Sequence, residues 1–167
     1  RELENSIHYF ADNPTADLNA FTNTILSQAL DESPVPPHSV VTINDVTETP
    51  IPTAAASPLA IILHELIENS IKHAFSAEGD VHYLQVRLAQ KTAVEMGHYH
   101  WELQVIDNGV GLEPGEHKQG RGLQVVHSLV KSLGGRIEIE TGHGTHITVR
   151  LPLHRGATEP ESDALPA

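Results

Sequence analysis

The sequence predicts an α+β fold, a two-layer α/β sandwich in which helices cover one face of a mixed, mostly antiparallel sheet. Three observations predict it. Alternating segments occur as pairs joined by short loops, amphipathic segments have helical spacing, and strands and helices do not alternate as in a regular parallel βαβ series. A length of 167 residues and an apolar content of 39% suit one globular domain with a core.

The first expected elements are a helix over residues 17–30 and a short strand over 39–45. The helix has apolar residues at helical spacing and Asp17 as a candidate N-cap, and a proline-containing segment ends it. The strand is short and rich in β-branched residues. Residues 47–58 are predicted to be a linker, because they combine prolines with small and polar residues. A second helix is expected over 59–75.

The rest of the sandwich is predicted to contain two hairpins and a third helix. Residues 81–90 and 99–106 alternate and predict an antiparallel hairpin. Residues 122–133 predict an amphipathic helix that ends at Gly134 and Gly135. Residues 136–140 and 145–153 predict two more strands joined by a glycine turn. The acidic, proline-containing segment from residue 154 onward predicts a disordered tail.

Charge and composition exclude several classes of function. The formal net charge of −12 argues against nucleic acid as a partner, because proteins that bind the phosphate backbone need a basic face. The absence of cysteine excludes disulfides, zinc–thiolate sites and thiol catalysis, and it is compatible with a reducing compartment. The sequence has no apolar run near the roughly 20 residues that a membrane-spanning helix needs.

The helix at 59–75 carries a polar strip beside a wide aliphatic face. At about 100° per residue, Glu65, Asn69, Lys72 and His73 fall on neighbouring turns of one side. A solvated helix face explains this strip, with a charge pair worth tenths of a kcal/mol. A metal–phosphate site explains it as well. In that interpretation the Asn69 oxygen suits Mg²⁺, the cationic side chains suit phosphate, and Glu65 orients or activates a nucleophile.

Three glycine-containing loops follow this helix in the sequence. Asp107 ends a strand just before Gly109 and Gly111, where a carboxylate can accept from an amine and the main chain can approach a ligand closely. An ordinary glycine-containing turn explains the same pattern equally well. The second loop, QGRG, opens a helix and leaves backbone N–H groups free for an anion. The third, GHGT, places Thr145 at the entry to a strand.

The order of these four motifs resembles the ATP-binding domain of the GHKL superfamily, over roughly residues 55–152. The segment LHELIENSIKHAF is similar to the N-box of bacterial sensor histidine kinases, and LGGRIEIETGHGTHITVRLP looks like the end of their catalytic (CA) domains. The resemblance implies a Bergerat-type fold, ATP and Mg²⁺ as cofactors, and transfer of the γ-phosphate of ATP to a histidine. It also implies a cytoplasmic location, whether or not the parent protein is anchored in a membrane.

The resemblance also implies a role for each matching residue. Glu65 and Asn69 would be catalytic, with Asn69 as the Mg²⁺ ligand. Asp107 would accept from the adenine amino group. The remaining residues would contact or support the nucleotide: Lys72, His73, Gly109, Gly111, Gly120, Arg121, Gly122, Leu123 and Thr145. The lid at 113–119 is short for the family, which is expected to weaken nucleotide affinity.

The expected domains are the truncated end of a dimerisation region with its connecting helix at 1–30, the catalytic domain at 31–153, and the tail at 154–167. The segment before Asp17 is too short for the helical hairpin that carries the phosphoacceptor, so His8 is not the expected acceptor. The implied partners are the dimerisation domain of a homodimeric parent and a response regulator. The alternative is a stand-alone regulator of the anti-sigma-factor type, which phosphorylates serine on a partner protein.

Overall fold

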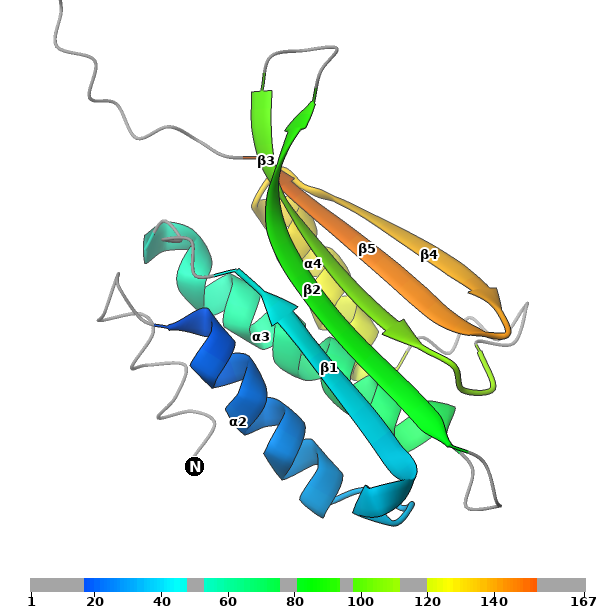
Figure 1. Ribbon diagram of the computed structural model, residues 1–167. Helices are drawn as coiled ribbons and strands as arrows, with labels where there is room; N and C mark the ends of the chain where they lie inside the picture. The colour runs from blue at the N-terminus through cyan, green and yellow to red at the C-terminus, as the bar shows by residue number, and fades with distance from the viewer. Residues whose placement is uncertain (1–16, 48–52, 76–80, 94–97, 112–119, 153–167) are drawn as a thin grey trace, which may run out of the picture.

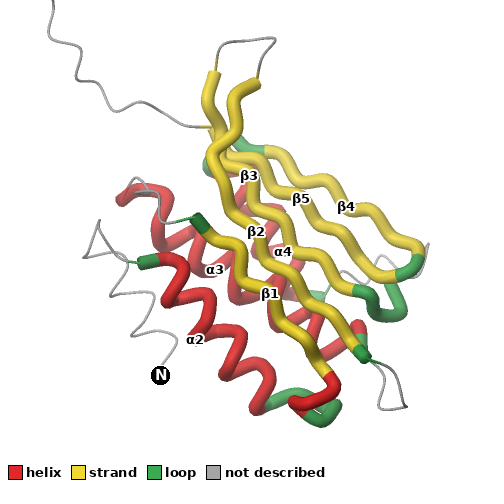
Figure 2. The backbone as a smooth tube through the Cα atoms, viewed as in Figure 1, coloured by secondary structure: helices red, strands yellow, loops and turns green. Residues whose placement is uncertain are grey.

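The computed structural model describes residues 17–47, 53–75, 81–93, 98–111 and 120–152. Within these ranges, helices α2, α3 and α4 lie on one face of a five-stranded mixed sheet, as Figure 1 and Figure 2 show. This arrangement confirms the predicted two-layer fold. The lid at 113–119, His8 and the tail from 154 lie outside the described residues.

The N-terminal helix α2 spans Leu18–Asp31, close to the predicted limits. Asp17 caps it as expected, because its side chain accepts from the backbone N–H groups of Asn19 at 2.9 Å and Ala20 at 3.1 Å. The short helix η1 (Pro37–Ser39) then leads into strand β1 (Val40–Val46). The buried face of α2 joins the common core through its apolar side chains: Leu18, Phe21, Ile25, Leu26 and Ala29.

Helix α3 spans Thr53–Asn69 and therefore begins earlier than predicted. The expectation of a linker over 47–58 is wrong for residues 53–58, which form the first turns of this helix. Alanine is the strongest helix former, and three alanines precede Pro58. A proline this close to the start of a helix removes only one backbone hydrogen bond, so it does not end the helix. A single π-helical turn, η2 (Ser70–Ala74), continues α3.

The sheet has the strand order β1-β2-β3-β5-β4. Strands β2 (His82–Ala93) and β3 (His98–Asp107) form the first predicted hairpin, and β4 (Arg136–Gly142) and β5 (Gly144–Pro152) form the second. The two hairpins join where β3 pairs antiparallel with β5. Only β1 pairs in parallel, with β2, which is why the long helical connection through α3 lies between them.

The core lies between the sheet and the helices. Side chains alternate along β2 and β3, so that Leu84, Val86 and Leu88 of β2 face the helices together with Trp101 and Leu103 of β3. The outer face is polar in its central part, where Arg150 contacts Glu102 at 2.9 Å and Glu138 at 2.8 Å. None of the helices in the described ranges is long and apolar enough to cross a bilayer.

Helix α4 (Arg121–Ser132) ends at the predicted glycines. The Gly135 N–H donates to the Val130 carbonyl at 2.9 Å, and the Gly134 N–H donates to the Lys131 carbonyl at 3.0 Å. Gly134 has a φ of 69°, the left-handed conformation that this helix ending requires. The sharp stop turns the chain directly into β4.

Candidate functional site

Asp107 lies at the end of β3 and is held by three hydrogen-bond donors. Its Oδ1 accepts from the backbone N–H of Gly109 and of Thr145, both at 3.0 Å, and its Oδ2 accepts from the Ser70 hydroxyl at 2.8 Å. The side chain is 6% exposed. A carboxylate offers about four acceptor positions, so this arrangement leaves one, on Oδ2, for a further donor.

Thr145 owes its contact with Asp107 to strand pairing. The two residues are directly opposite each other where β3 pairs with β5. Ser70 reaches the same carboxylate from the π-helical turn η2, on the other side of it. Thr145 was expected at this site from the sequence, whereas Ser70 was not, and its only sequence signal is its place next to Asn69.

The glycines of the first loop allow a close approach to η2. A Cβ atom on Gly109 would overlap the backbone of Ala74, and the next residue, Val110, donates its N–H to the Ala74 carbonyl at 2.9 Å. Gly111 has a φ of 75°, which favours glycine. Gly144 likewise has a φ of 97°, and a Cβ there would overlap the Asp107 backbone. The loop after Asp107 is therefore packed between η2 and the β4–β5 turn.

Glu65 and Asn69 of α3 lie against the first turn of α4. A Cβ atom on Gly122 would overlap the Glu65 carboxylate, and it would lie 3.5 Å from the Asn69 amide nitrogen. Gly120 is the N-cap of α4, and within the described residues it has no side-chain cap and no atom within 4 Å of an added Cβ. The positive end of the α4 dipole thus faces the Glu65 carboxylate, and backbone N–H groups at an uncapped helix start are suited to anions.

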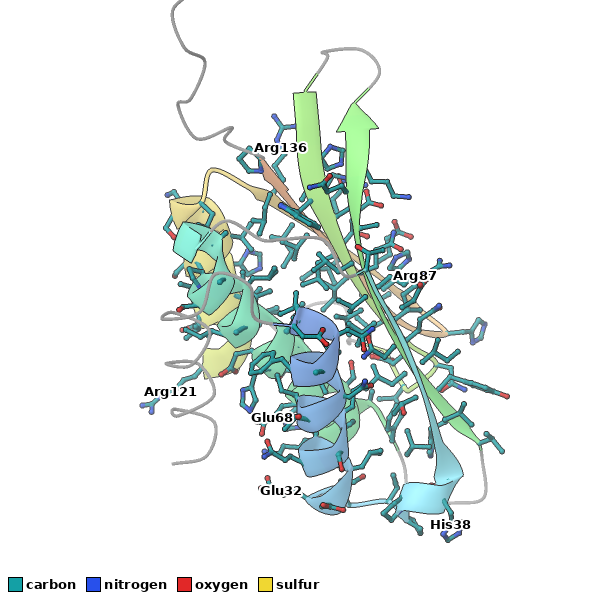
Figure 3. The ribbon with its side chains drawn as sticks, turned by 60° about the vertical axis from the view of Figure 1, so that its left-hand side comes forward. Glu32, His38, Glu68, Arg87, Arg121 and Arg136 are labelled. Carbon is teal, nitrogen blue, oxygen red and sulfur yellow. The ribbon has the colours of Figure 1, made fainter. Side chains whose placement is uncertain are left out.

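Lys72 is directed toward helix α2. Its Nζ lies 3.0 Å from Glu68 and 3.6 Å from Glu32, the C-cap residue of α2. Figure 3 shows Glu68 of α3 and Glu32 of α2 on the sides of the two helices that face each other. The hydrogen bond to Glu68 raises the pKa of Lys72 above its usual value, and the attraction of Glu32 adds to this rise. Lys72 would have to leave these carboxylates to contact a phosphate.

The other predicted site residues have different surroundings. His73 is exposed, and Arg121 is exposed at the start of α4, pointing away from the helices and the sheet in Figure 3. Leu123 is 8% exposed and packs in the hydrophobic core. No group of three or more histidines, aspartates or glutamates in the described residues could hold a metal ion. The nucleotide and metal roles of all these residues stay predictions.

Comparison with known proteins identifies the class. Residues 54–155 match the family described as "Histidine kinase-, DNA gyrase B-, and HSP90-like ATPase". The match includes more than half of the chain, so the chain belongs to this family, and the resemblance found in the sequence is confirmed. Membership of this ATPase family implies that the domain binds ATP.

Two of the relatives that the chain resembles are histidine kinases by name. The chain is 30% identical over 107 residues to the signal transduction histidine-protein kinase/phosphatase UhpB of Salmonella typhimurium. The aligned region covers 64% of this chain and 19% of UhpB. It is 35% identical over 112 residues to the sensor histidine kinase PdtaS of Mycobacterium tuberculosis. Here the aligned region covers 60% of this chain and 20% of PdtaS. The chain therefore spans about a fifth of the length of these relatives.

Solved structures share the fold. The histidine kinase domain of the blue-light activated kinase EL346 from Erythrobacter litoralis superimposes with a TM-score of 0.68 at 22% identity, over 84% of this chain and 63% of that one. The mycobacterial sensor histidine kinase MprB superimposes with a TM-score of 0.57 at 20% identity, over 82% of this chain and 96% of that one. At these identities the likeness supports the fold alone.

Proposed function

We propose that this chain is the ATP-binding catalytic domain of a two-component sensor histidine kinase, which transfers the γ-phosphate of ATP to a histidine on the dimerisation domain of its parent protein. The observation that carries the proposal is the buried Asp107 carboxylate, fixed by Ser70, Gly109 and Thr145 with one acceptor position left. The sensor kinases among its relatives support the same activity.

Asp107 recognises adenine in this proposal. The free acceptor position on Oδ2 takes the exocyclic amino group of the base, which donates a hydrogen bond. Gly109 and Gly111 border the base in this proposal, because Gly109 lets the loop pack closely on η2 and neither glycine adds a side chain beside Asp107. Thr145 supports this pocket through its N–H, which fixes the carboxylate.

The phosphates lie at the start of α4 in this proposal. Gly120 and Gly122 expose backbone N–H groups there, next to Arg121 and the buried Leu123 that anchors the helix. Lys72 and His73 follow Asn69 on the continuation of α3 and supply positive charge once Lys72 is released from its carboxylates. Phosphoryl transfer depends mainly on such positioning and charge neutralisation.

Asn69 and Glu65 complete the proposed site. Mg²⁺ in nucleotide sites is held by a few protein oxygens together with phosphates and water, and the Asn69 amide oxygen is a ligand of this kind. When bound, the ion would neutralise charge on the phosphates. The Glu65 carboxylate lies beside Asn69 and against α4, where it can orient or deprotonate the incoming nucleophile.

The proposed setting is that of a sensor kinase. In this proposal residues 1–30 comprise the end of the dimerisation region and a connecting helix, α2, which packs on the catalytic domain at 31–153, and residues 154–167 form a tail. The partners are the dimerisation domain of a homodimeric parent and a response regulator, and the domain works in the cytoplasm. The formal net charge of −12 agrees with the absence of nucleic acid among these partners.

Two measurements test the proposal. Calorimetry with ATP should show binding that strengthens when Mg²⁺ is added, and no heat at millimolar nucleotide would refute the proposal. In the parent protein with its dimerisation domain, labelled phosphate from ATP should appear on a histidine. Label on serine of a separate protein would instead identify the regulator of the anti-sigma-factor type.

A further inference from the structure

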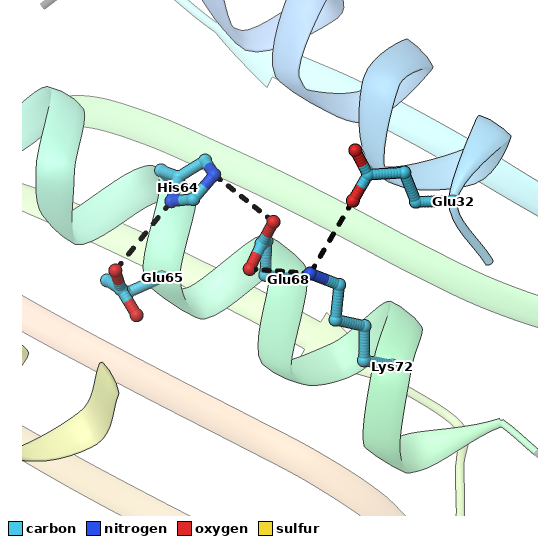
Figure 4. Close-up of polar contacts among 5 residues, drawn as sticks. All are labelled: Glu32, His64, Glu65, Glu68 and Lys72. Carbon is cyan, nitrogen blue, oxygen red and sulfur yellow. Dashed lines mark ion pairs between the residues drawn. The ribbon is translucent and has the colours of Figure 1, made fainter. Parts of the chain in front are cut away.

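A chain of ionisable side chains reaches from the end of α2, across η2 and α3, to the start of α4. Figure 4 shows its members in order: Glu32, Lys72, Glu68, His64 and Glu65. His64 contributes the last two contacts. Its Nε2 lies 3.3 Å from Glu68 Oε1, and its Nδ1 lies 3.8 Å from Glu65 Oε1. The imidazole therefore lies between two carboxylates that would otherwise repel each other.

Both oxygens of Glu65 have a neighbour that restricts them. Oε1 faces the His64 imidazole, and Oε2 lies against Gly122 in the first turn of α4. The Glu65 side chain is 29% exposed and the His64 side chain is 17% exposed, so water competes only in part for these contacts. A glutamate on a helix surface normally samples several rotamers, and two contacts at opposite oxygens restrict it to one orientation.

His64 is itself held on its far side. Glu68 binds the Nε2 edge of the ring and is in turn bound by Lys72 at 3.0 Å. The contact of His64 with Glu68 at 3.3 Å is the shorter of the two, and the contact with Glu65 at 3.8 Å is an electrostatic one, longer than a hydrogen bond. The ring that points at Glu65 is thus anchored in place and does not depend on Glu65 for its own orientation.

We propose that His64 is a positioning residue for Glu65. Its imidazole holds the carboxylate against the start of α4, in the orientation in which Glu65 acts on the nucleophile. The inference rests on the proposed function, because it assigns His64 a part in the phosphate transfer that Glu65 is proposed to assist. His64 does not touch the nucleotide in this proposal, so its loss should slow transfer and leave ATP affinity unchanged.

Two substitutions separate the two edges of the ring. The amide of asparagine reaches about as far as Nδ1, so His64→Asn keeps a polar N–H group on the side of Glu65. The longer glutamine reaches toward Nε2, so His64→Gln keeps the donor that faces Glu68 and loses the one that faces Glu65. His64→Ala loses both. The matched control is His38→Ala, because His38 is an exposed histidine on η1, far from Glu68 in Figure 3.

The experiment measures phosphate transfer at saturating ATP in the parent protein with its dimerisation domain, and ATP affinity by calorimetry. We expect His64→Ala and His64→Gln to lower the transfer rate about tenfold, less than the loss of a general base itself, with ATP affinity within about twofold. His64→Asn should keep at least about half of the rate, and His38→Ala should match the wild type. Thermal unfolding of each variant identifies any general loss of structure.

Three outcomes would overturn the inference: wild-type transfer in His64→Ala, a better rescue by glutamine than by asparagine, or a loss of ATP affinity equal to the loss of rate. These outcomes differ from failure of the proposed function. In that case the wild-type protein itself would neither bind ATP nor transfer phosphate to a histidine.

Discussion

At the scale of single residues, Asp107 is the side chain whose surroundings are most specific. A carboxylate buried to this degree is unfavourable unless it is hydrogen-bonded, and here two backbone N–H groups and one hydroxyl compensate for the loss of water. Those donors come from β5, from the loop after β3 and from η2, so three separate elements fix a single carboxylate. Such an arrangement fixes the direction of the one acceptor position that remains.

Replacing Asp107 with asparagine should weaken ATP binding at least about tenfold, since a hydrogen bond to a charged group contributes roughly 1.5–3 kcal/mol. The fold should survive, because the asparagine oxygen still accepts from Gly109 and Thr145 while its NH₂ replaces the acceptor that faces the ligand. Calorimetry with ATP measures the effect. Asp45→Asn is the control, because Asp45 is exposed and pairs with Arg87 on β2. Unchanged affinity in Asp107→Asn would contradict the assignment of the adenine site.

At the scale of the elements, Gly122 lets α4 pack closely on Glu65 of α3. Gly122→Ala adds a Cβ that overlaps the Glu65 carboxylate, whereas Gly120→Ala, two residues earlier, adds a Cβ with no atom of the described residues within 4 Å. The Glu65 carboxylate is the end of a flexible side chain and can move aside, and alanine favours a helix interior by about 1 kcal/mol over glycine. We therefore expect Gly122→Ala to keep the melting temperature but to slow phosphate transfer in the parent protein, because it displaces Glu65, while Gly120→Ala keeps the transfer rate. Equal transfer rates in the two variants would refute the close packing.

The contact of α2 with α3 includes the ion pair between Glu32 and Lys72. The raised pKa of Lys72 means that its contribution to stability is complete below the ordinary value of 10.5 and is lost as the pH rises through the raised value. The side chains of Lys72 and Glu32 are 36% and 68% exposed, so the pair contributes only tenths of a kcal/mol at neutral pH.

Glu32→Gln removes one of the two carboxylates that hold Lys72 away from α4. If Lys72 contacts phosphate, as proposed, this variant should bind ATP about two- to fivefold more tightly, by reducing the competition for the amine. Asp31→Asn is the matched control, because it removes one exposed charge from the neighbouring position of α2. Calorimetry at low salt checks both variants. An unchanged or weaker affinity in Glu32→Gln would argue against the phosphate role of Lys72.

The limits of helices and strands could be predicted from the sequence where a few neighbouring residues determine them. The cap at Asp17, the stop at Gly134 and the alternation along β2 and β3 each depend on a few neighbouring residues, and the structure agrees with all three. The start of α3 was not predictable in this way, because Pro58 is a breaker by type and its effect depends on how near it lies to the helix start.

The residues of the candidate site were easier to predict from the sequence than the directions and contact partners of their side chains. The π-helical turn after Asn69 rotates the following residues less than a regular helix does, so the angles expected for Lys72 and His73 did not apply. The partners that matter are also distant in sequence: Ser70 meets Asp107, and Lys72 meets Glu32. Such contacts follow from packing of the whole domain, which periodicity along one segment does not describe.

At the scale of the whole molecule, one hydrophobic core joins α2, α3, η2 and α4 with the five strands of the sheet. The family match begins at residue 54, yet the buried side chains of α2, which precede it, pack in the same core as α3 and the sheet. Figure 1 shows α2 beside α3 on the covered face, next to β1. Helix α2 is therefore expected to fold and unfold with the rest of the domain, and not as an independent segment.

Ile25→Ala tests this cooperativity. Ile25 is 1% exposed in α2, and truncating such a side chain should cost about 2–5 kcal/mol of unfolding free energy. Trp101, the single tryptophan, is 2% exposed in β3, so its fluorescence reports on the sheet, while far-ultraviolet circular dichroism reports on the helices. We expect Ile25→Ala to lower the urea midpoint measured by fluorescence and the one measured by circular dichroism by the same amount, as in a two-state transition. Ile43→Ala, on the exposed face of β1 with Ile43 42% exposed, should change stability by only about 0.5–1 kcal/mol. A dichroism transition that separates from the fluorescence transition in Ile25→Ala would show that α2 unfolds by itself.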